Sequence, residues 1–182
     1  MRRYPLANQH SVLLNGPPGI GKTTVVRVLA EQLAEQRLAG FYTAEIRVAG
    51  ERKGFRLETL DGREAVIAHV DFPHRHRVGK YGVDVAAIDS IAVSALIIDP
   101  RVALYLVDEI GKMECLSHRF VAAMRALLDA RVPVVATVAE KGTGYNTEVK
   151  ARNDISLLRL TRENRSRLPQ HVLRWLSERQ RL

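Results

Sequence analysis

The segment GPPGIGKTT at residues 16–24 constrains the fold of this chain more than any other stretch. It matches the pattern G-x-x-x-x-G-K-[ST] and stands between an apolar run at residues 11–14 and a segment with helical spacing of apolar residues. In this setting, glycines let successive backbone N–H groups point into one anion-sized hollow at a helix N-terminus. The segment therefore predicts a phosphate-binding loop (P-loop). The alternative is an ordinary turn between a strand and a helix.

Three side chains of this loop have expected roles toward a nucleoside triphosphate. Lys22 can reach the β- and γ-phosphates, the Thr23 hydroxyl can bind Mg²⁺, and Thr24 is a further donor for the α-phosphate. The loop residues that we expect to bind nucleotide are Gly16, Pro17, Pro18, Gly19, Ile20, Gly21, Lys22, Thr23 and Thr24.

Length and composition indicate one α/β domain over residues 1–182. No apolar run approaches the roughly 20 residues that cross a bilayer, so we expect no membrane association. A single cysteine cannot form an internal disulfide, which suits the cytoplasm, and we expect a monomer there. The net charge of +8 makes nucleic acid a conceivable partner. We favour a solvated, arginine-rich surface instead, because the arginines are spread along the chain and only 5% of residues are aromatic.

Strand and helix patterns alternate along the chain. Strands are predicted at residues 10–14, 41–47, 103–107, 132–138 and 155–160, and helices at 22–36, 85–95, 117–130 and 147–152. Thr161 should cap a basic helical region that Pro169 interrupts or restarts. Residues 54–60 and 65–70 predict a β-hairpin around Asp61-Gly62, and residues 71–83 a polar loop. Together these elements predict a mostly parallel central sheet flanked by helices, with the hairpin added outside the parallel core.

A second motif, LYLVDE at residues 104–109, is an apolar strand that ends in two carboxylates. This is the Walker B pattern, in which Asp108 would hold Mg²⁺ together with Thr23. Glu109, directly after it, can orient a water in line with the γ-phosphate. The alternative for Glu109 is an ion pair with one of the many arginines. Both motifs follow strands, so both should lie at the carboxyl edge of the sheet.

The next residues add a candidate cation. Lys112 could stabilise charge on the γ-phosphoryl oxygens, whereas an exposed loop lysine is the alternative. Glu114 we expect to be a solvated surface charge. The predicted catalytic residues are thus Lys22, Glu109 and Lys112, and the predicted metal ligands are Thr23 and Asp108. The second nucleotide-binding segment comprises Val107, Asp108, Glu109, Ile110, Gly111, Lys112 and Met113.

Five motifs in one order resemble a known family. They are the P-loop, GFYTAEIR at 40–47, RVGKY at 77–81, VDEIGKME at 107–114 and TRENR at 161–165. Together they look like the THEP-type nucleoside triphosphatases, a family that includes the vertebrate cancer-related nucleoside triphosphatase. The resemblance runs from about residue 10 to about residue 170. It implies a RecA-like P-loop fold and slow Mg²⁺-dependent hydrolysis of nucleoside triphosphates to diphosphate and phosphate, with low base specificity.

Other classes of protein use the same P-loop and Walker B motifs. No Asn-Lys-x-Asp stretch follows the later strands, so the guanine-reading motif of GTPases is missing. A P-loop kinase that transfers the γ-phosphoryl to a small acceptor is an alternative, since residues 48–83 are long enough to hold an acceptor pocket. A nucleic-acid-associated ATPase switch is a third possibility.

Overall fold

The computed structural model describes residues 9–73 and 75–179. Over these ranges the strands form one nine-stranded sheet in the order β5-β6-β4-β3-β2-β7-β8-β1-β9. Five strands pair in parallel: β1 (Ser11–Gly16), β2 (Leu38–Val48), β7 (Leu104–Ile110), β8 (Val134–Ala139) and β9 (Ile155–Arg159). The predicted α/β class with a parallel centre is confirmed. Parallel neighbours are joined by helices, because a crossover has to return the chain to the starting edge.

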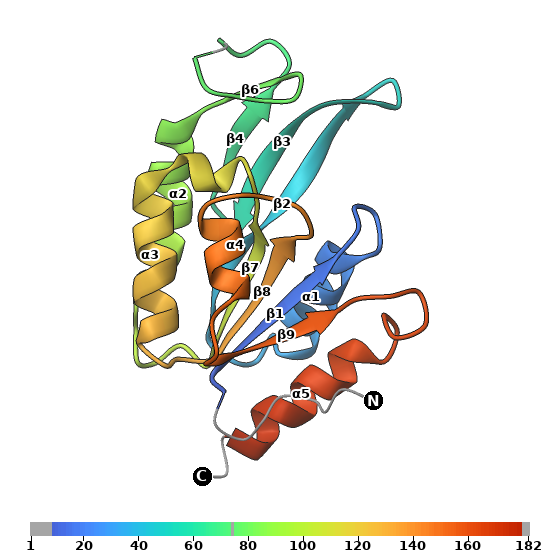
Figure 1. The fold of residues 1–182 in the computed structure, drawn as a ribbon, viewed down its shortest axis with the longest axis vertical. Coiled ribbons are helices and arrows are strands. Elements are labelled where there is room, and N and C mark those ends of the chain that lie inside the picture. The colour runs from blue at the N-terminus through green and yellow to red at the C-terminus, as the bar shows by residue number, and fades with distance from the viewer. Residues whose placement is uncertain (1–8, 74, 180–182) are drawn as a thin grey trace.

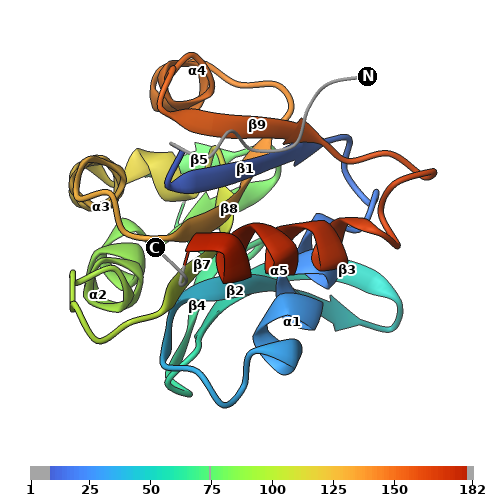
Figure 2. The ribbon, with the colours of Figure 1, turned by 90° about the horizontal axis from the view of Figure 1, so that it is seen from below.

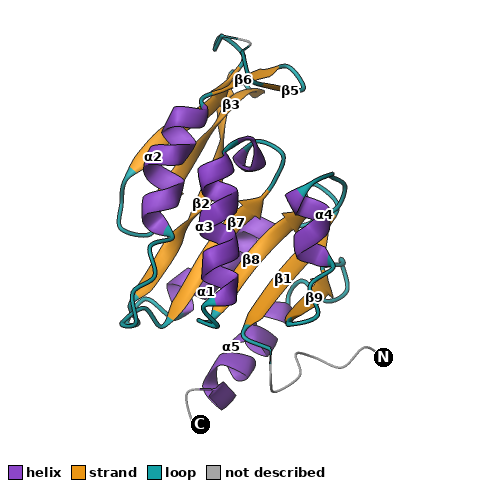
Figure 3. Ribbon diagram, turned by 60° about the vertical axis from the view of Figure 1, so that its left-hand side comes forward, coloured by secondary structure: helices purple, strands orange, loops and turns teal. Residues whose placement is uncertain are grey.

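The other four strands extend the sheet beyond β2 in antiparallel pairs. They are β3 (Glu51–Thr59), β4 (Glu64–His69), β5 (Arg77–Val78) and β6 (Tyr81–Val83). Figure 3 shows this extension continuing the sheet toward the end of the molecule opposite the C-terminal helix. The predicted hairpin is present as β3 and β4. The prediction of a polar loop at 71–83 is wrong for residues 77–83, which form a second, shorter hairpin.

Helices cover both faces of the sheet (Figure 1). One face carries α2 (Val85–Ala95), α3 (His118–Asp129) and α4 (Tyr145–Lys150), and the other carries α1 (Lys22–Gln32) and α5 (Leu168–Arg179). A short 3₁₀-helix, η1 (Glu114–Leu116), follows β7. The view in Figure 2 separates the two helical layers. None of the helices in the described ranges combines the length and apolar character that a membrane crossing needs.

Each face of the sheet has its own hydrophobic core. On β1, Leu13 packs into the core beneath α2 and α3, whereas Val12 and Leu14 pack into the core beneath α1 and α5. All three side chains are fully buried. This explains the unbroken apolar run before the P-loop, since a central parallel strand is covered on both sides.

Helix boundaries follow local capping. Asp84 accepts a hydrogen bond from the Ala87 N–H at 2.9 Å, and Ser117 Oγ accepts one from the Phe120 N–H at 2.8 Å. These side chains satisfy donors at the starts of α2 and α3 that have no partner within the helix. Helix α1 ends at Gln32 and not at residue 36 as predicted. The chain must turn there, because Leu38 already pairs with Leu104 as β2 begins.

At the C-terminal end, Thr161 caps a run of helical turns, as predicted. Its Oγ1 accepts a hydrogen bond from the Asn164 N–H, and Asn164 Oδ1 accepts one from the Thr161 N–H. The regular helix α5 begins only at Leu168, with Pro169 in its first turn. Proline is favourable there, because its missing N–H would have no partner within the helix.

Candidate active site

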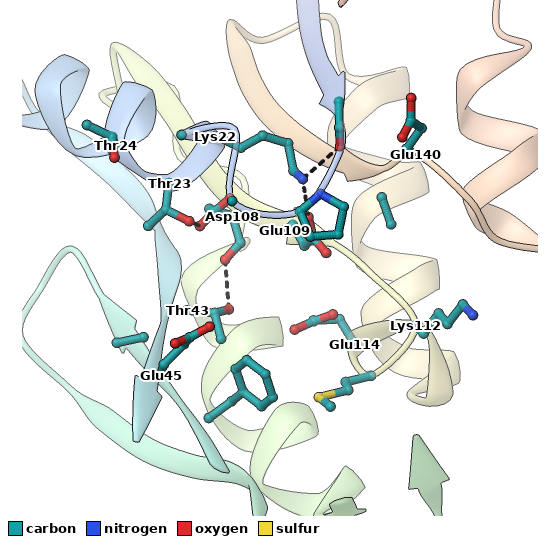
Figure 4. Close-up of a pocket in the computed structure, with 18 of the residues that line it drawn as sticks. Lys22, Thr23, Thr24, Thr43, Glu45, Asp108, Glu109, Lys112, Glu114 and Glu140 are labelled. Carbon is teal, nitrogen blue, oxygen red and sulfur yellow. Dashed lines mark hydrogen bonds and ion pairs between the residues drawn. The ribbon is translucent and has the colours of Figure 1, made fainter. Parts of the chain in front are cut away.

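The two predicted motifs meet at the carboxyl edge of the parallel strands. The P-loop lies between β1 and α1, and Asp108 and Glu109 lie near the end of β7. A cleft of about 1090 Å³ opens between them. It is lined by the P-loop and α1, by β2 and β3, by the β7–η1 segment and by the loop after β8. Figure 4 shows the side chains that project into it. The carboxyl edge is where open α/β sheets bind their ligands.

Lys22 joins the two halves of the site. Its Nζ donates to the Gly16 carbonyl oxygen at 3.1 Å and lies 3.6 Å from Glu109 Oε2 (Figure 4). The Lys22 side chain is 11% exposed and that of Glu109 is 32% exposed. The ammonium group is therefore held at the mouth of the P-loop, where a phosphate would lie.

Asp108 is the most strongly fixed carboxylate of the cleft, at 3% exposed. Thr23 Oγ1 donates to its Oδ2 and Thr137 Oγ1 to its Oδ1, each at 2.5 Å. Burial raises the pKa of Asp108, and the two hydroxyl groups oppose this by stabilising the charged form. Thr43 Oγ1 also donates to the Asp108 carbonyl oxygen at 2.8 Å. The carboxylate thus has one oxygen directed to the P-loop and one to β8.

The chemistry of this donor set fits Mg²⁺, which prefers oxygen ligands and takes one or two from protein when phosphates supply others. Thr23 Oγ1 and Asp108 Oδ2 converge on the same region of the cleft. Within the described ranges, no group of three or more His, Cys, Asp or Glu side chains could hold a metal by itself.

Sequence reasoning missed Thr43, Thr137 and Asn146. Asn146 Nδ2 donates to the Ile110 carbonyl oxygen at 3.0 Å and so ties α4 to the end of β7. Thr43 and Thr137 lie on β2 and β8, the strands on either side of β7. In the sequence, each of these two threonines is a polar residue near the carboxyl end of an apolar strand, which marks it as a candidate. The sequence does not show that β2 and β8 are the strands beside β7, so it could not place either threonine next to Asp108.

The prediction that Glu114 is a solvated surface charge is wrong. The side chain lies at the start of η1, is 4% exposed and points into the cleft (Figure 4). Burial raises its pKa to about 8, and the neighbouring Glu109 and Asp108 add to this shift. The 3₁₀ turn folds the chain back after β7, which carries Glu114 inward.

Glu109 is also partly desolvated. Burial raises its pKa, the nearby Lys22 ammonium lowers it, and the negative charge of Asp108 raises it. Its ion-pair partner among the described residues is Lys22 and not an arginine. Lys112, by contrast, lines the cleft but is exposed, and Figure 4 shows its side chain extending away from Lys22 and Glu109.

The remaining predicted residues divide into two groups. Those that line the cleft are Gly16, Pro18, Gly19, Gly21, Lys22, Thr23, Thr24, Asp108, Glu109, Lys112 and Met113. Val107 and Ile110 are fully buried in the core, and Ile20 packs into the other core. Pro17 is exposed and Gly111 is buried in the loop. None of these five residues is among those that line the cleft.

The fold is that of a P-loop NTPase, with the glycine-rich loop at residues 16–24 facing an acidic strand end across the cleft. A family model described as NTPase matches residues 11–173. The nucleoside-triphosphatase THEP1 of Thermotoga sp. (strain RQ2) is 39% identical over 163 residues, which cover 89% of this chain and 92% of that protein. The chain belongs to this NTPase family.

Two further comparisons agree. The cancer-related nucleoside-triphosphatase homolog of Mus musculus is 35% identical over 173 residues, which cover 86% of this chain and 91% of that protein. The crystal structure of THEP1 from the hyperthermophile Aquifex aeolicus superimposes with a TM-score of 0.83 at 33% identity. That match covers 91% of this chain and 98% of the other. The resemblance noted from the five motifs is confirmed.

Proposed function

We propose that this protein is a nucleoside-triphosphate phosphatase that hydrolyses the γ-phosphate bond and releases nucleoside diphosphate and phosphate. Family membership supports this activity. The observation that carries the proposal is the position of Glu109, whose Oε2 lies 3.6 Å from Nζ of the P-loop lysine. A carboxylate at that point lies beside the γ-phosphate that Lys22 would bind, where it can accept a hydrogen bond from an attacking water.

Each residue has a defined task in this proposal. The P-loop N–H groups and Lys22 bind the β- and γ-phosphates, and Glu109 orients the water and accepts its proton. Thr23 and Asp108 would hold Mg²⁺, which when bound neutralises charge on the phosphate oxygens. Thr137 fixes Asp108 from the opposite side through its 2.5 Å hydrogen bond.

We also propose low base specificity. Three of the aromatic residues that could stack on a base, Phe41, Tyr81 and Tyr145, are buried in the core. Among the described residues that line the cleft, Phe55 is the one aromatic side chain. The protein thus offers many contacts to phosphates and few to a base, so ATP, GTP and other triphosphates should be accepted.

The test is phosphate release from ATP, GTP, CTP and UTP, with Mg²⁺ or EDTA and without any acceptor. We expect release from all four that requires Mg²⁺, and no turnover by Lys22→Ala, because the main phosphate contact is lost. Parallel reactions with RNA or a small acceptor separate the alternatives. Release that occurs only while an acceptor becomes phosphorylated would reject hydrolysis in favour of phosphoryl transfer.

A further inference from the structure

The pairing of strand β7 with its two neighbours leaves Glu109 out. Strand β2 pairs with β7 as far as Asp108, and the pairing with β8 passes from Val107 directly to Ile110. In the described part of the chain, Glu109 therefore has no partner residue in either ladder. Such an irregularity disrupts the ladder locally, so the position of Glu109 depends on other contacts.

Two side chains hold the backbone on either side of Glu109. Thr43 Oγ1, on β2, donates to the Asp108 carbonyl oxygen at 2.8 Å (Figure 4), and Asn146 Nδ2, on α4, donates to the Ile110 carbonyl oxygen at 3.0 Å. The first carbonyl belongs to the peptide group just before Glu109, and the second to the peptide group that follows Ile110. The short stretch that carries Glu109 is thus fixed at both ends, from two different elements.

Asn146 occupies its position at a cost to stability. It is 2% exposed, and its Oδ1 is buried without a hydrogen-bond partner among the described residues. Gly142 provides room for this group, since a Cβ on Gly142 would lie 2.7 Å from Asn146 Oδ1. A buried oxygen without a partner is unfavourable. The contact that offsets this cost is the hydrogen bond from Nδ2 to Ile110.

The side chain of Glu109 needs such a backbone restraint. Its partner Lys22 lies 3.6 Å away, and we expect that lysine to bind phosphate during turnover. A general base has to lie within hydrogen-bond reach of the water that it activates, and a misplacement of about 1 Å can lower a rate about 10²-fold. The carboxylate must therefore be aimed through its own backbone.

We propose that Thr43 and Asn146 are positioning residues for hydrolysis, which together clamp the backbone around Glu109 and so aim its carboxylate at the phosphate-binding loop. The inference rests on the proposed function, because it assigns roles within the same reaction. Thr43 lines the cleft and Asn146 does not. A change at Asn146 can therefore act on the reaction only through its neighbours, which are β7 and the loop at residues 139–144.

The first experiment measures steady-state hydrolysis of ATP with Mg²⁺. Loss of either donor, in Thr43→Val or Asn146→Ala, should lower kcat at least about tenfold and change KM less than about threefold. Thr43→Ser keeps the hydroxyl and should stay within about threefold of wild type. The control is Thr147→Val on α4, which removes a 3.0 Å hydrogen bond to the Gly142 carbonyl but leaves β7 untouched. It should keep the wild-type kcat.

A double-variant cycle tests whether the clamp acts through Glu109. In a Glu109→Gln background, adding Thr43→Val or Asn146→Ala should lower the residual rate less than about twofold, because the base that the clamp aims is already absent. Glu31→Gln, which changes an exposed carboxyl on α1, is the control background, in which the losses should be full. Losses of equal size in both backgrounds would overturn the inference.

Amide hydrogen exchange supplies a readout that does not depend on hydrolysis. In the nucleotide-free protein, the segment at residues 104–113 should exchange faster in Thr43→Val and Asn146→Ala than in wild type or Thr147→Val. Unchanged exchange or unchanged kcat in both clamp variants would overturn the inference, and so would an equal loss of kcat in Thr147→Val.

If Asn146→Ala does not fold, the comparison of Thr43→Val with Thr43→Ser decides. Absence of phosphate release by wild type would instead reject the proposed hydrolysis itself, and hydrogen exchange would still show whether the clamp holds β7.

Discussion

At the scale of single residues, Glu109 carries the chemical assignment. The change Glu109→Gln should preserve nucleotide binding and lower hydrolysis at least about 10²-fold, because an amide cannot accept the proton of the attacking water. Nucleotide affinity from calorimetry and phosphate release from the same preparation check this. Turnover at the wild-type rate would show that the water is activated by another group. Glu31→Gln is the matched control for loss of one carboxylate.

Lys112 is exposed, and its side chain extends away from Lys22. If it stabilises the transferred phosphoryl group, Lys112→Ala should lower kcat at least about tenfold while KM changes less. The measurement is a full kinetic curve for ATP. A rise in KM with unchanged kcat would make Lys112 a binding residue only.

Residue patterns predicted that the loop at residues 16–24 and the pair Asp108-Glu109 would lie at one edge of the sheet, and they do. Lys22 follows β1, whereas Asp108 and Glu109 lie near the end of β7, and parallel strands end at one edge of the sheet. Glu114 could not be placed in the same way. A charged residue five positions after Glu109 is normally solvated, and only the inward turn of η1 shows that it is buried.

At the scale of elements, Gly40 decides whether β2 can join the parallel sheet. It pairs with Leu106 of β7 and has φ 112°, and a Cβ there would lie 1.9 Å from the Leu106 carbonyl oxygen. Gly40→Ala should therefore lower the free energy of unfolding by at least about 2 kcal/mol, measured by urea denaturation.

Gly62→Ala is the control for that change. Gly62 lies in the β3–β4 turn with φ 88°, but nothing lies within 4 Å of its added Cβ. It has the unfavourable φ without the clash, so it should cost about 1 kcal/mol. Equal losses in the two variants would mean that the contact with β7 does not limit the position of β2.

In the antiparallel extension of the sheet, the sequence predicted the first hairpin but not the second. Residues 54–60 and 65–70 were identifiable as a hairpin because Asp61-Gly62 separates them. Residues 77–83 lack such a pattern, since β5 and β6 are two and three residues long. Their strands form because β6 pairs with β4, a contact that local sequence does not encode.

At the scale of the whole molecule, Glu114 should make stability depend on pH. Its folded pKa of about 8 exceeds the ordinary value of 4.5, so the folded state binds the proton more tightly. That stabilisation is present in full below about pH 4.5 and is lost as pH rises through 8. The Tm of the nucleotide-free protein should then fall between pH 6 and pH 9, and Glu114→Gln should flatten this slope.

Thermal unfolding monitored by circular dichroism between pH 6 and pH 9 compares the Tm of wild type with that of Glu114→Gln. The exposed carboxylates with lowered pKa values, such as Asp99 at about 2, act in the opposite sense only as the pH falls well below 5. Between pH 6 and pH 9, the expected change in stability therefore comes from the buried carboxyl groups. A wild-type Tm that stays level or rises there would contradict the burial of an ionisable Glu114.

The sequence by itself determined the glycine-rich loop between a strand and a helix, the acidic strand end, the alternation of strands and helices, and the resemblance to a family. The strands and helices follow from the spacing of apolar residues within short segments, and the loop follows from its glycines. The tertiary structure alone decided that Thr43 and Thr137 flank Asp108, that β5 and β6 complete the sheet, and that Glu114 is buried beside the cleft. Each of these depends on strand order or on a turn of the chain, which place distant or unpatterned residues together.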